Sequence, residues 1–368
     1  MNGSADRLNE NISPRLASLF FYLTWRCNLR CSHCWVDAGE GGNDECEMDL
    51  IDSFLEQALL NPISFIKFSG GEPTLCWDKL VHIVEKTKGL GITYALETNG
   101  LFLSEEKVNY LKTNKITIHM SLNGTSPLRQ DDFSGVEGSF SHALESLEIM
   151  KKLNYLPDEI VTCVDLVTMH ELRDRIDFFA DLGVKRVKVN PIMPQGRGEN
   201  SARDGLGLSP KDHLSLVRIV EEIRQTASIR VFLDEPMCTR SFADIHKHTG
   251  LSSCGLASIL SFLPNASLSL CGYGNIDESV IVAHWDNQSS LSDIWANNDL
   301  LKQIRCTGAK TLAEPCSDCI HLDVCQGSCR VSSYHRYGRW DMPMPLCRDL
   351  YEIGLFPSSR LTSRSSKV

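Results

Sequence analysis

The chain has 368 residues, 42% of them hydrophobic and 23% charged, which is enough for two globular domains. Acidic residues outnumber basic ones by 47 to 37, giving a formal net charge of −10. A nucleic-acid surface needs clustered Lys and Arg, so this balance argues against a nucleic-acid partner. The N-terminus has no basic segment before an apolar stretch, and the early apolar run Leu16–Leu23 is too short to span a bilayer. We therefore expect a cytoplasmic protein without a membrane partner.

Strand-like segments rich in Ile, Val, Phe and Thr alternate with amphipathic helical patterns through the first two-thirds of the chain. The expected strands are Ser18–Thr24, Ile63–Phe68, Ile92–Thr98, Ile116–Leu122, Ile160–Val167 and Val184–Asn190. Such alternation predicts parallel strands joined by right-handed crossovers. The preferred α/β fold class is a partial (β/α)6 TIM-like barrel, and an open doubly wound sheet is the alternative. Both folds bind ligands at the carboxyl ends of their strands.

The pattern changes near Ser228, where strand-like pieces become short and cysteines become frequent. The last helix of the first part is expected to begin at Ser209-Pro210, an N-cap residue followed by proline at the first helical position. The composition of the last residues, rich in Ser and Arg, indicates disorder. The expected segments are an N-terminal tail (1–16), the barrel (17–227), a cysteine-rich domain (228–356) and a disordered tail (357–368).

Cysteines are unusually numerous. Fifteen cysteines in a cytoplasmic chain would stay reduced, so metal or cluster ligation explains them better than disulfides. Cys27, Cys31 and Cys34 follow the first strand directly. Three thiolates at this spacing can ligate three irons of one [4Fe–4S] cube and leave its fourth iron open. A zinc site with His33 as a fourth ligand is the alternative, although zinc ligands more often come as well-separated pairs.

Glycines and short polar side chains follow the next strands. Paired glycines let the backbone approach a ligand closely, and Glu72 adds a carboxylate suited to an ammonium group. A single loop of this kind is usually an ordinary turn, whereas several at one edge of a sheet indicate a ligand site. The residues concerned are Gly70, Gly71, Glu72, Pro73, Thr98, Asn99, Ser121 and Asn123, together with Asn190–Gly196 after the sixth strand.

A second group of cysteines lies toward the C-terminus. It has the spacing Cx2Cx5Cx3C and comprises Cys316, Cys319, Cys325 and Cys329, followed by Cys347 and preceded by Cys254 and Cys271. Seven cysteines nearly suffice for two clusters of four ligands each. From composition alone, zinc sites are the alternative. The spacing of the acidic residues and histidines does not single out a catalytic acid or base.

With both cysteine groups in this order, the chain resembles radical S-adenosylmethionine (radical SAM) enzymes of the SPASM-domain subfamily from about Leu19 to Leu350. The resemblance implies three [4Fe–4S] clusters and S-adenosylmethionine as cofactors, and an electron donor such as flavodoxin or ferredoxin. Cys27, Cys31 and Cys34 would hold the radical-generating cluster. Its reduction would cleave S-adenosylmethionine to a 5′-deoxyadenosyl radical, which abstracts hydrogen from the substrate.

The resemblance also implies roles for the other residues. Gly70, Gly71, Glu72 and Pro73 would bind the amino group of the methionine moiety, Ser121 and Asn123 its ribose or carboxylate, and His33 or Trp35 would stack on adenine. A distal auxiliary cluster would be held by Cys316, Cys319, Cys325 and Cys347. A nearer one would be held by Cys254, Cys271 and Cys329. The fourth position of the nearer cluster is either filled by a residue such as Cys238 or left as an open iron.

The subfamily works mostly on peptides, so we expect post-translational modification of a peptide or protein substrate, such as a crosslink or an epimerisation. A radical SAM enzyme that modifies a tetrapyrrole, a haem or haem d1 precursor, is the alternative, because only 26 residues precede Cys27 and many peptide maturases have a recognition domain there. A sulfatase maturase is less favoured, because Gly272 stands where that branch has an Asp. A non-catalytic electron carrier would leave the strand-end loops without a purpose.

Overall fold

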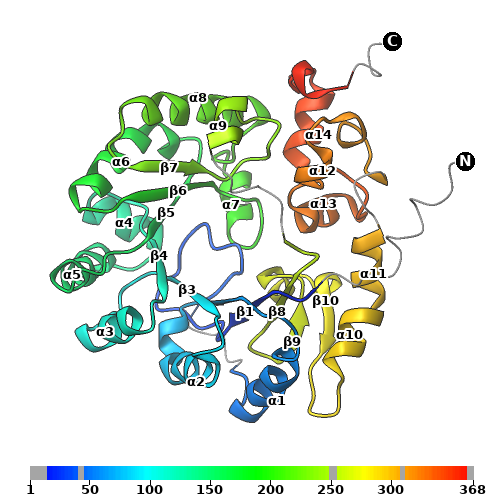
Figure 1. Cartoon of the computed structure of the whole chain (residues 1–368). Helices are drawn as coiled ribbons and strands as arrows, with labels where there is room; N and C mark the ends of the chain where they lie inside the picture. The colour runs from blue at the N-terminus through cyan, green and yellow to red at the C-terminus, as the bar shows by residue number, and fades with distance from the viewer. Residues whose placement is uncertain (1–14, 40–44, 248–254, 307–310, 363–368) are drawn as a thin grey trace, which may run out of the picture.

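A computed structural model describes residues 15–39, 45–247, 255–306 and 311–362. These residues contain a ten-stranded sheet of order β10-β9-β8-β1-β2-β3-β4-β5-β6-β7. Figure 1 shows the part from β1 to β7 curving around an open centre. The strands are β1 Ser18–Tyr22, β2 Phe65–Ser69, β3 Thr93–Thr98, β4 Thr117–Ser121, β5 Glu159–Val164, β6 Arg186–Pro191, β7 Arg230–Leu233, β8 Ile259–Phe262, β9 Ser267–Ser269 and β10 Ile281–His284.

Strands β1 to β7 pair in chain order, and every neighbouring pair is parallel. A doubly wound sheet would instead reverse its strand order at a switch point. The partial barrel is therefore confirmed and the doubly wound alternative is wrong. All six expected strands are present, and their ends differ from the expected ones by at most three residues.

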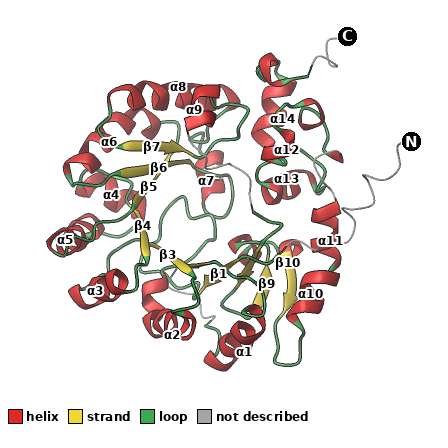
Figure 2. Ribbon diagram, viewed as in Figure 1, coloured by secondary structure: helices red, strands yellow, loops and turns green. Residues whose placement is uncertain are grey.

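Helices cover the outer face of the curved sheet (Figure 2). Helix α8 begins where expected, because the Ser209 side chain accepts from the Asp212 backbone N–H while Asp212 accepts from that of Ser209. The helices are α1 Met48–Ala58, α2 Trp77–Thr87, α3 Glu105–Thr113, α4 Pro127–Ser134, α5 Ser139–Lys152, α6 Leu172–Asp181, α7 Gly198–Arg203, α8 Pro210–Thr226, α9 Phe242–Lys247, α10 Leu291–Asn297, α11 Asp299–Cys306, α12 Leu322–Cys325, α13 Arg330–Tyr337 and α14 Pro345–Glu352. None of these described helices combines the length and apolar character that crossing a membrane requires.

The sheet continues beyond the expected barrel on both sides. Strand β7 extends it past β6, and β8 pairs in parallel with the free edge of β1 before β9 and β10 follow antiparallel. The ring centroid of Phe54 in α1 lies 4.7 Å from that of Phe262 in β8 and 5.5 Å from that of Trp285. The boundary expected at residue 228 thus falls before another barrel strand, and residues 259–285 share the core of the barrel.

The C-terminal segment contains α12, α13 and α14, which lie beside the open side of the barrel in Figure 1. The tail from residue 357 was expected to be disordered, but its first part is ordered. It forms a 3-10 turn at Ser358–Arg360, and Leu361 bridges to Cys319. The buried Arg360 side chain donates to the carbonyl of Arg240 at 2.7 Å. Residues 363–368 and most of the expected N-terminal tail lie outside the described part of the chain.

Candidate active site at the carboxyl ends of the strands

Cys27, Cys31 and Cys34 lie in the loop that leaves the carboxyl end of β1. The backbone N–H of Leu29 donates to the sulfur of Cys27, and that of Ala38 donates to the sulfur of Cys34, both at 3.4 Å. Donors directed at sulfur favour the thiolate, the form that ligates metals. Burial nevertheless raises the pKa of Cys27 to about 12. A nearby cationic centre such as a coordinated metal would favour the deprotonated form of the Cys27 thiol.

A set of three thiols is a donor set that suits an iron–sulfur cube. Among the described residues, no three His, Cys, Asp or Glu side chains converge on one point that could hold one metal ion. A cube needs no such point, because each of its cysteines ligates a different iron. When bound here, such a cluster supplies the electron for reductive cleavage of S-adenosylmethionine.

Gly70 and Gly71, at the end of β2, lie against the backbone of the cysteine loop. The N–H of Gly71 donates to the carbonyl of Thr24 at 2.7 Å, and a Cβ atom on Gly71 would overlap the carbonyl of Arg26. Gly70 has a φ of +138°, a conformation that side chains disfavour. The paired glycines therefore allow this loop and the cysteine loop to pack together at one edge of the barrel.

The Glu72 carboxylate is fully buried and hydrogen-bonded within the protein. One oxygen accepts from the Thr74 N–H at 3.0 Å, the Thr74 hydroxyl at 2.6 Å and the Thr98 hydroxyl at 2.7 Å. The other accepts from the Asn99 N–H at 2.8 Å. Burial raises the pKa of Glu72, while these bonds lower it. We expected this carboxylate to face an ammonium group, but in the structure it joins the loops after β2 and β3.

Asn99 carries this connection on to the cysteine loop. Its side-chain amide donates to Asn28 Oδ1 at 2.8 Å and lies 3.9 Å from the sulfur of Cys27. Pro73, which follows Glu72, begins the short helix Pro73–Cys76. The structure thus brings the expected residues of the β2 and β3 loops together with the first cysteines of the cluster motif.

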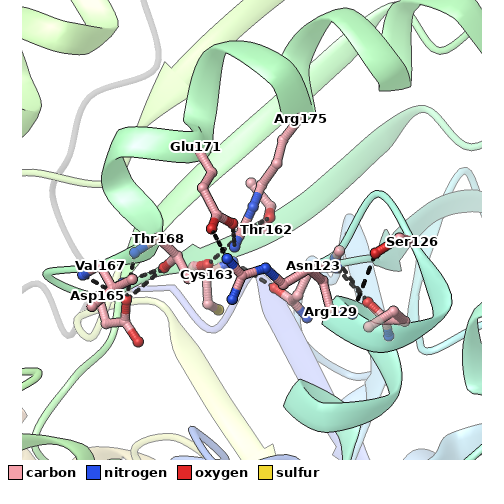
Figure 3. Close-up of polar contacts among 12 residues, drawn as sticks. Asn123, Ser126, Arg129, Thr162, Cys163, Asp165, Val167, Thr168, Glu171 and Arg175 are labelled. Atoms are coloured by element: carbon pink, nitrogen blue, oxygen red, sulfur yellow. Dashed lines mark hydrogen bonds and ion pairs between the residues drawn. The ribbon is translucent and has the colours of Figure 1, made fainter.

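The side chain of Asn123, which follows β4, is also hydrogen-bonded within the protein (Figure 3). Its side-chain oxygen accepts from the Cys163 N–H at 2.7 Å, which ties the end of β4 to that of β5. The N–H groups of Asn123 and Gly124 donate to Gln130 Oε1 at 2.8 and 3.0 Å. Ser121, the last residue of β4, is exposed. Of the two residues, Ser121 is therefore the one whose side chain faces solvent.

A buried arginine of α6, Arg175, contacts the carboxyl end of β5 (Figure 3). The Arg175 guanidinium donates to the Cys163 carbonyl at 3.0 Å and to the Thr162 hydroxyl at 3.3 Å. Glu171 lies 3.6 Å from Arg175 and 2.5 Å from Arg129 of α4. The carboxyl end of β5 is therefore held in place by α4 and α6 together.

His33 and Trp35 were both expected to be able to stack on adenine. The His33 ring instead packs on Phe133 of α4, with 4.4 Å between ring centroids. Burial lowers the pKa of His33 to about 4, so the ring is neutral at pH 7, and its buried Nδ1 atom has no partner within the described part of the chain. Trp35 is half-buried against the core. One face of His33 is therefore already covered by protein.

Arg197 was not foreseen from the sequence, although the loop expected after β6 ends one residue before it. Its Nε donates to the Cys31 carbonyl at 2.8 Å, its backbone N–H to the Cys34 carbonyl at 3.0 Å, and its guanidinium pairs with Asp37 at 2.7 Å. A Cβ atom on the preceding Gly196 would overlap the same Cys34 carbonyl. The flanking glycines in Gly196-Arg197-Gly198 were the available signal, since they mark close backbone approach.

A second group of thiols lies in the C-terminal segment. Four expected ligands, Cys316, Cys319, Cys325 and Cys347, line one cavity together with His321, whose buried Nε2 has no hydrogen-bond partner among the residues that the structure describes. Cys238 lines the same cavity, with its sulfur 3.4 Å from that of Cys347. The β7–α9 loop thus places Cys238 beside the expected ligands of the distal cluster, whereas the sequence offered it as a ligand of the nearer one.

Cys271 and Cys329, two expected ligands of the nearer cluster, lie close enough for the charge of one to affect the other. Burial and the proximity of Cys329 raise the pKa of Cys271 to about 12. Cys329 accepts from the Ser332 hydroxyl at 3.2 Å, and Ser332 in turn accepts from the buried Gln195 amide at 3.4 Å. Gln195 lies in the loop that contacts the first cysteine motif, so the two regions are linked. Cys254 lies outside the described residues.

A layer of paired charges lines the inner face of the barrel. The Lys67 ammonium of β2 lies 2.9 Å from Glu97 of β3, and Lys188 of β6 lies 2.9 Å from Asp234. Burial would raise the pKa of Glu97, but Lys67 and the Ser69 hydroxyl lower it to about 2. The layer is thus polar, and each of these two lysines is paired with a carboxylate.

The fold and the site together place a three-cysteine loop and several polar strand-end loops at one end of a partial barrel. The family model described as "Radical SAM superfamily" matches residues 21–182, which include the first cysteine motif and the loops around it. This part of the chain is therefore a radical SAM domain.

Similar proteins cover nearly the whole chain. "AdoMet-dependent heme synthase" of Methanosarcina barkeri is 25% identical over 91% of this chain and 96% of its own. "Mycofactocin maturase MftC" of Mycolicibacterium smegmatis is 22% identical over 89% and 82%, and "PqqA peptide cyclase" of Bradyrhizobium diazoefficiens is 23% identical over 88% and 84%. The solved structure of anSMEcpe with bound AdoMet and Kp18Cys peptide has the same fold, with a TM-score of 0.70 at 18% identity over 92% and 96% of the two chains.

Proposed function

We propose that this radical SAM enzyme carries two auxiliary [4Fe–4S] clusters in a SPASM domain and modifies a peptide or protein substrate after translation. The observation that carries the proposal is the grouping of the C-terminal cysteines. The expected distal ligands share one cavity with the His321 Nε2 atom, which has no partner among the described residues, and Cys271 and Cys329 lie close enough to interact electrostatically. A buried cavity lined by thiols suits an iron–sulfur cluster, which each cysteine ligates through one iron.

The roles within the first site follow from its contacts. Cys27, Cys31 and Cys34 would hold the radical-generating cluster. Because the carboxylate of Glu72 is already bonded, the amino group of S-adenosylmethionine would be left to the exposed carbonyls of the Gly70-Gly71 segment. Ser121 is free to contact the ribose or carboxylate, whereas Asn123 positions β5. Trp35 would stack on adenine in preference to His33, one face of which is covered.

A peptide substrate agrees with the inner face of the barrel. A haem precursor presents several carboxylates, which need unpaired cations for tight binding. Among the described residues of β2 to β6, Lys67 and Lys188 are both paired with carboxylates on this face. Polar, mixed-charge lining suits the amides and varied side chains of a peptide. The relative named PqqA peptide cyclase and the peptide-bound anSMEcpe structure support the same substrate class.

A tetrapyrrole is the second candidate, favoured by the likeness to AdoMet-dependent heme synthase over 91% of the chain. The two candidates are separated by isotope transfer. The enzyme, reconstituted with iron and sulfide without oxygen, is reduced with dithionite and given S-adenosylmethionine and a deuterated short peptide encoded next to its gene. Deuterium in 5′-deoxyadenosine and a peptide that has lost hydrogen are expected. Unlabelled deoxyadenosine and an unchanged peptide, with turnover of a haem-precursor tetrapyrrole, would replace the peptide proposal by the second candidate.

A further inference from the structure

The distal cavity contains one thiol more than a cluster requires. Cys238, Cys316, Cys319, Cys325 and Cys347 all line it. A [4Fe–4S] cube takes four cysteines, one at each iron. Four of these five lie in the C-terminal segment, whereas Cys238 comes from the loop between β7 and α9, which belongs to the barrel side of the molecule. One thiol of the five is therefore in excess.

The distance between two of the sulfur atoms shows which two thiols would compete for one iron. The sulfurs of Cys238 and Cys347 are 3.4 Å apart, which is van der Waals contact, and both side chains are buried. Thiolates bound to different irons of one cube are held farther apart by the cube itself. Cys238 and Cys347 can therefore serve only the same iron, and each is placed to take the position of the other.

The loop that carries Cys238 is held in place. The N–H and hydroxyl of Thr239 both donate to the carbonyl of Pro236, at 3.1 and 2.8 Å. From the opposite side, the buried Arg360 donates to the carbonyl of Arg240 at 2.7 Å and lies on the ring of Phe242, 3.7 Å from its centroid. Cys238 also packs in one apolar cluster with Leu346, Cys347, Leu350 and Phe356. Its position beside Cys347 is thus fixed by contacts on two sides.

We propose that Cys238 and Cys347 are alternative ligands of one iron of the distal auxiliary cluster. The proposal rests on the distal cluster of the proposed function. When Cys238 replaces Cys347, the Cys238 thiol releases its proton as its sulfur binds iron, and the departing Cys347 sulfur takes up a proton. The number of Fe–S bonds and of electrons is unchanged. The exchange would keep the cluster attached when either thiol is lost.

The test counts iron and sulfide in the full-length enzyme after anaerobic reconstitution, for the wild type, Cys238→Ala, Cys347→Ala and the double variant. The wild type and both single variants are expected to keep about twelve irons per chain, from three four-iron clusters, and the double variant about eight. Cys316→Ala, whose thiol has no such neighbour in contact, is expected to keep about eight. Cys46→Ala, which removes a buried cysteine that belongs to neither motif, is the control for loss of a packed thiol. Thermal melting of the cluster-free proteins shows whether each variant folds.

Loss of about four irons from Cys347→Ala alone, in a variant that folds like the wild type, would overturn the inference and make Cys238 a packing residue. Loss of that cluster from Cys238→Ala alone would overturn it too, because Cys347 would not be a substitute. Only about four irons in the wild type would instead remove the auxiliary clusters of the proposed function. The failure of this inference and the failure of the proposed function therefore give different iron counts.

Discussion

The Arg197 guanidinium donates a 2.8 Å hydrogen bond to the carbonyl of Cys31, across 166 positions of sequence. Through this bond the loop after β6 contacts the loop after β1, so segments that follow the first and sixth strands meet at the candidate cluster site. The Arg197 side chain is only 12% exposed, and its pairing with Asp37 adds a second point of attachment. The conformation of the cysteine loop therefore depends on a residue outside the cysteine motif.

We predict that Arg197→Ala weakens the hold of the protein on its first cluster. Leaving a partly buried carbonyl without its donor costs about 1–3 kcal/mol. The cluster should then be lost several-fold faster to an iron chelator, followed by the EPR signal that responds to S-adenosylmethionine. Arg203→Ala removes an arginine whose side chain is 72% exposed and should not change the rate. Equal rates for the two variants would contradict this role.

Glu72→Gln should destabilise the junction of the β2 and β3 loops. A carboxylate accepts all the hydrogen bonds that Glu72 receives, whereas the amide NH2 of Gln cannot accept from the Asn99 N–H. The expected loss is about 1–3 kcal/mol in the free energy of unfolding, measured by urea denaturation of the cluster-free protein. Weaker S-adenosylmethionine binding to the loaded enzyme should accompany it. Glu106→Gln, on the exposed side of α3, is the matched control, and an equal effect there would refute the assignment.

Phe54→Ala should destabilise the barrel and the β8–β10 extension together. Phe54 is fully buried between Phe262 and Trp285, and such truncations cost about 3–5 kcal/mol. One unfolding transition at a lower temperature is expected, with Trp fluorescence and circular dichroism changing together. Leu60→Ala, at a residue that is 81% exposed, should leave the unfolding temperature unchanged. A separate, unshifted transition for the β8–β10 segment would show that the two parts have independent cores.

The charge layer of the barrel predicts a pH dependence. Lys67 and Ser69 depress the pKa of Glu97 to about 2 in the folded state, below its ordinary value of 4.5. A carboxylate of this kind stabilises the fold above its unfolded pKa and loses that contribution as pH falls toward its folded pKa. The cluster-free protein should therefore lose stability between about pH 5 and pH 2, and Glu97→Gln should reduce the slope. Identical slopes for the variant and the wild type would contradict the pairing.

Much of the fold could be predicted from periodicity. The expected strands differ from the observed ones only at their ends, because alternating strands and helices of this length have few other arrangements. Strand β7 and the β8–β10 extension were missed because their strands have four residues or fewer, too short for a periodic pattern to stand out. The order of residues 357–362 depends on Arg360 and its contact with a loop 120 positions away, which local composition cannot reveal.

The candidate site was only partly predictable. The cysteines and strand-end loops could be found because their chemistry and their position at strand ends are local features. The internal bonding of Glu72 and Asn123, by contrast, depends on donors from other loops. Cys238 lies 109 positions from Cys347, so their contact could not be inferred from motif spacing. Arg197 likewise bonds to the cysteine loop from a position 166 residues away in the sequence.

We propose that Cys27, Cys31 and Cys34 hold the cluster on which cleavage of S-adenosylmethionine depends. The direct test compares wild type, Cys31→Ala and Cys46→Ala after anaerobic reconstitution and dithionite reduction, assaying 5′-deoxyadenosine and counting iron. The wild type and Cys46→Ala should form deoxyadenosine, while Cys31→Ala should form none and lose about four irons. Zinc in place of iron in the wild type, or deoxyadenosine formed equally by Cys31→Ala, would contradict the account.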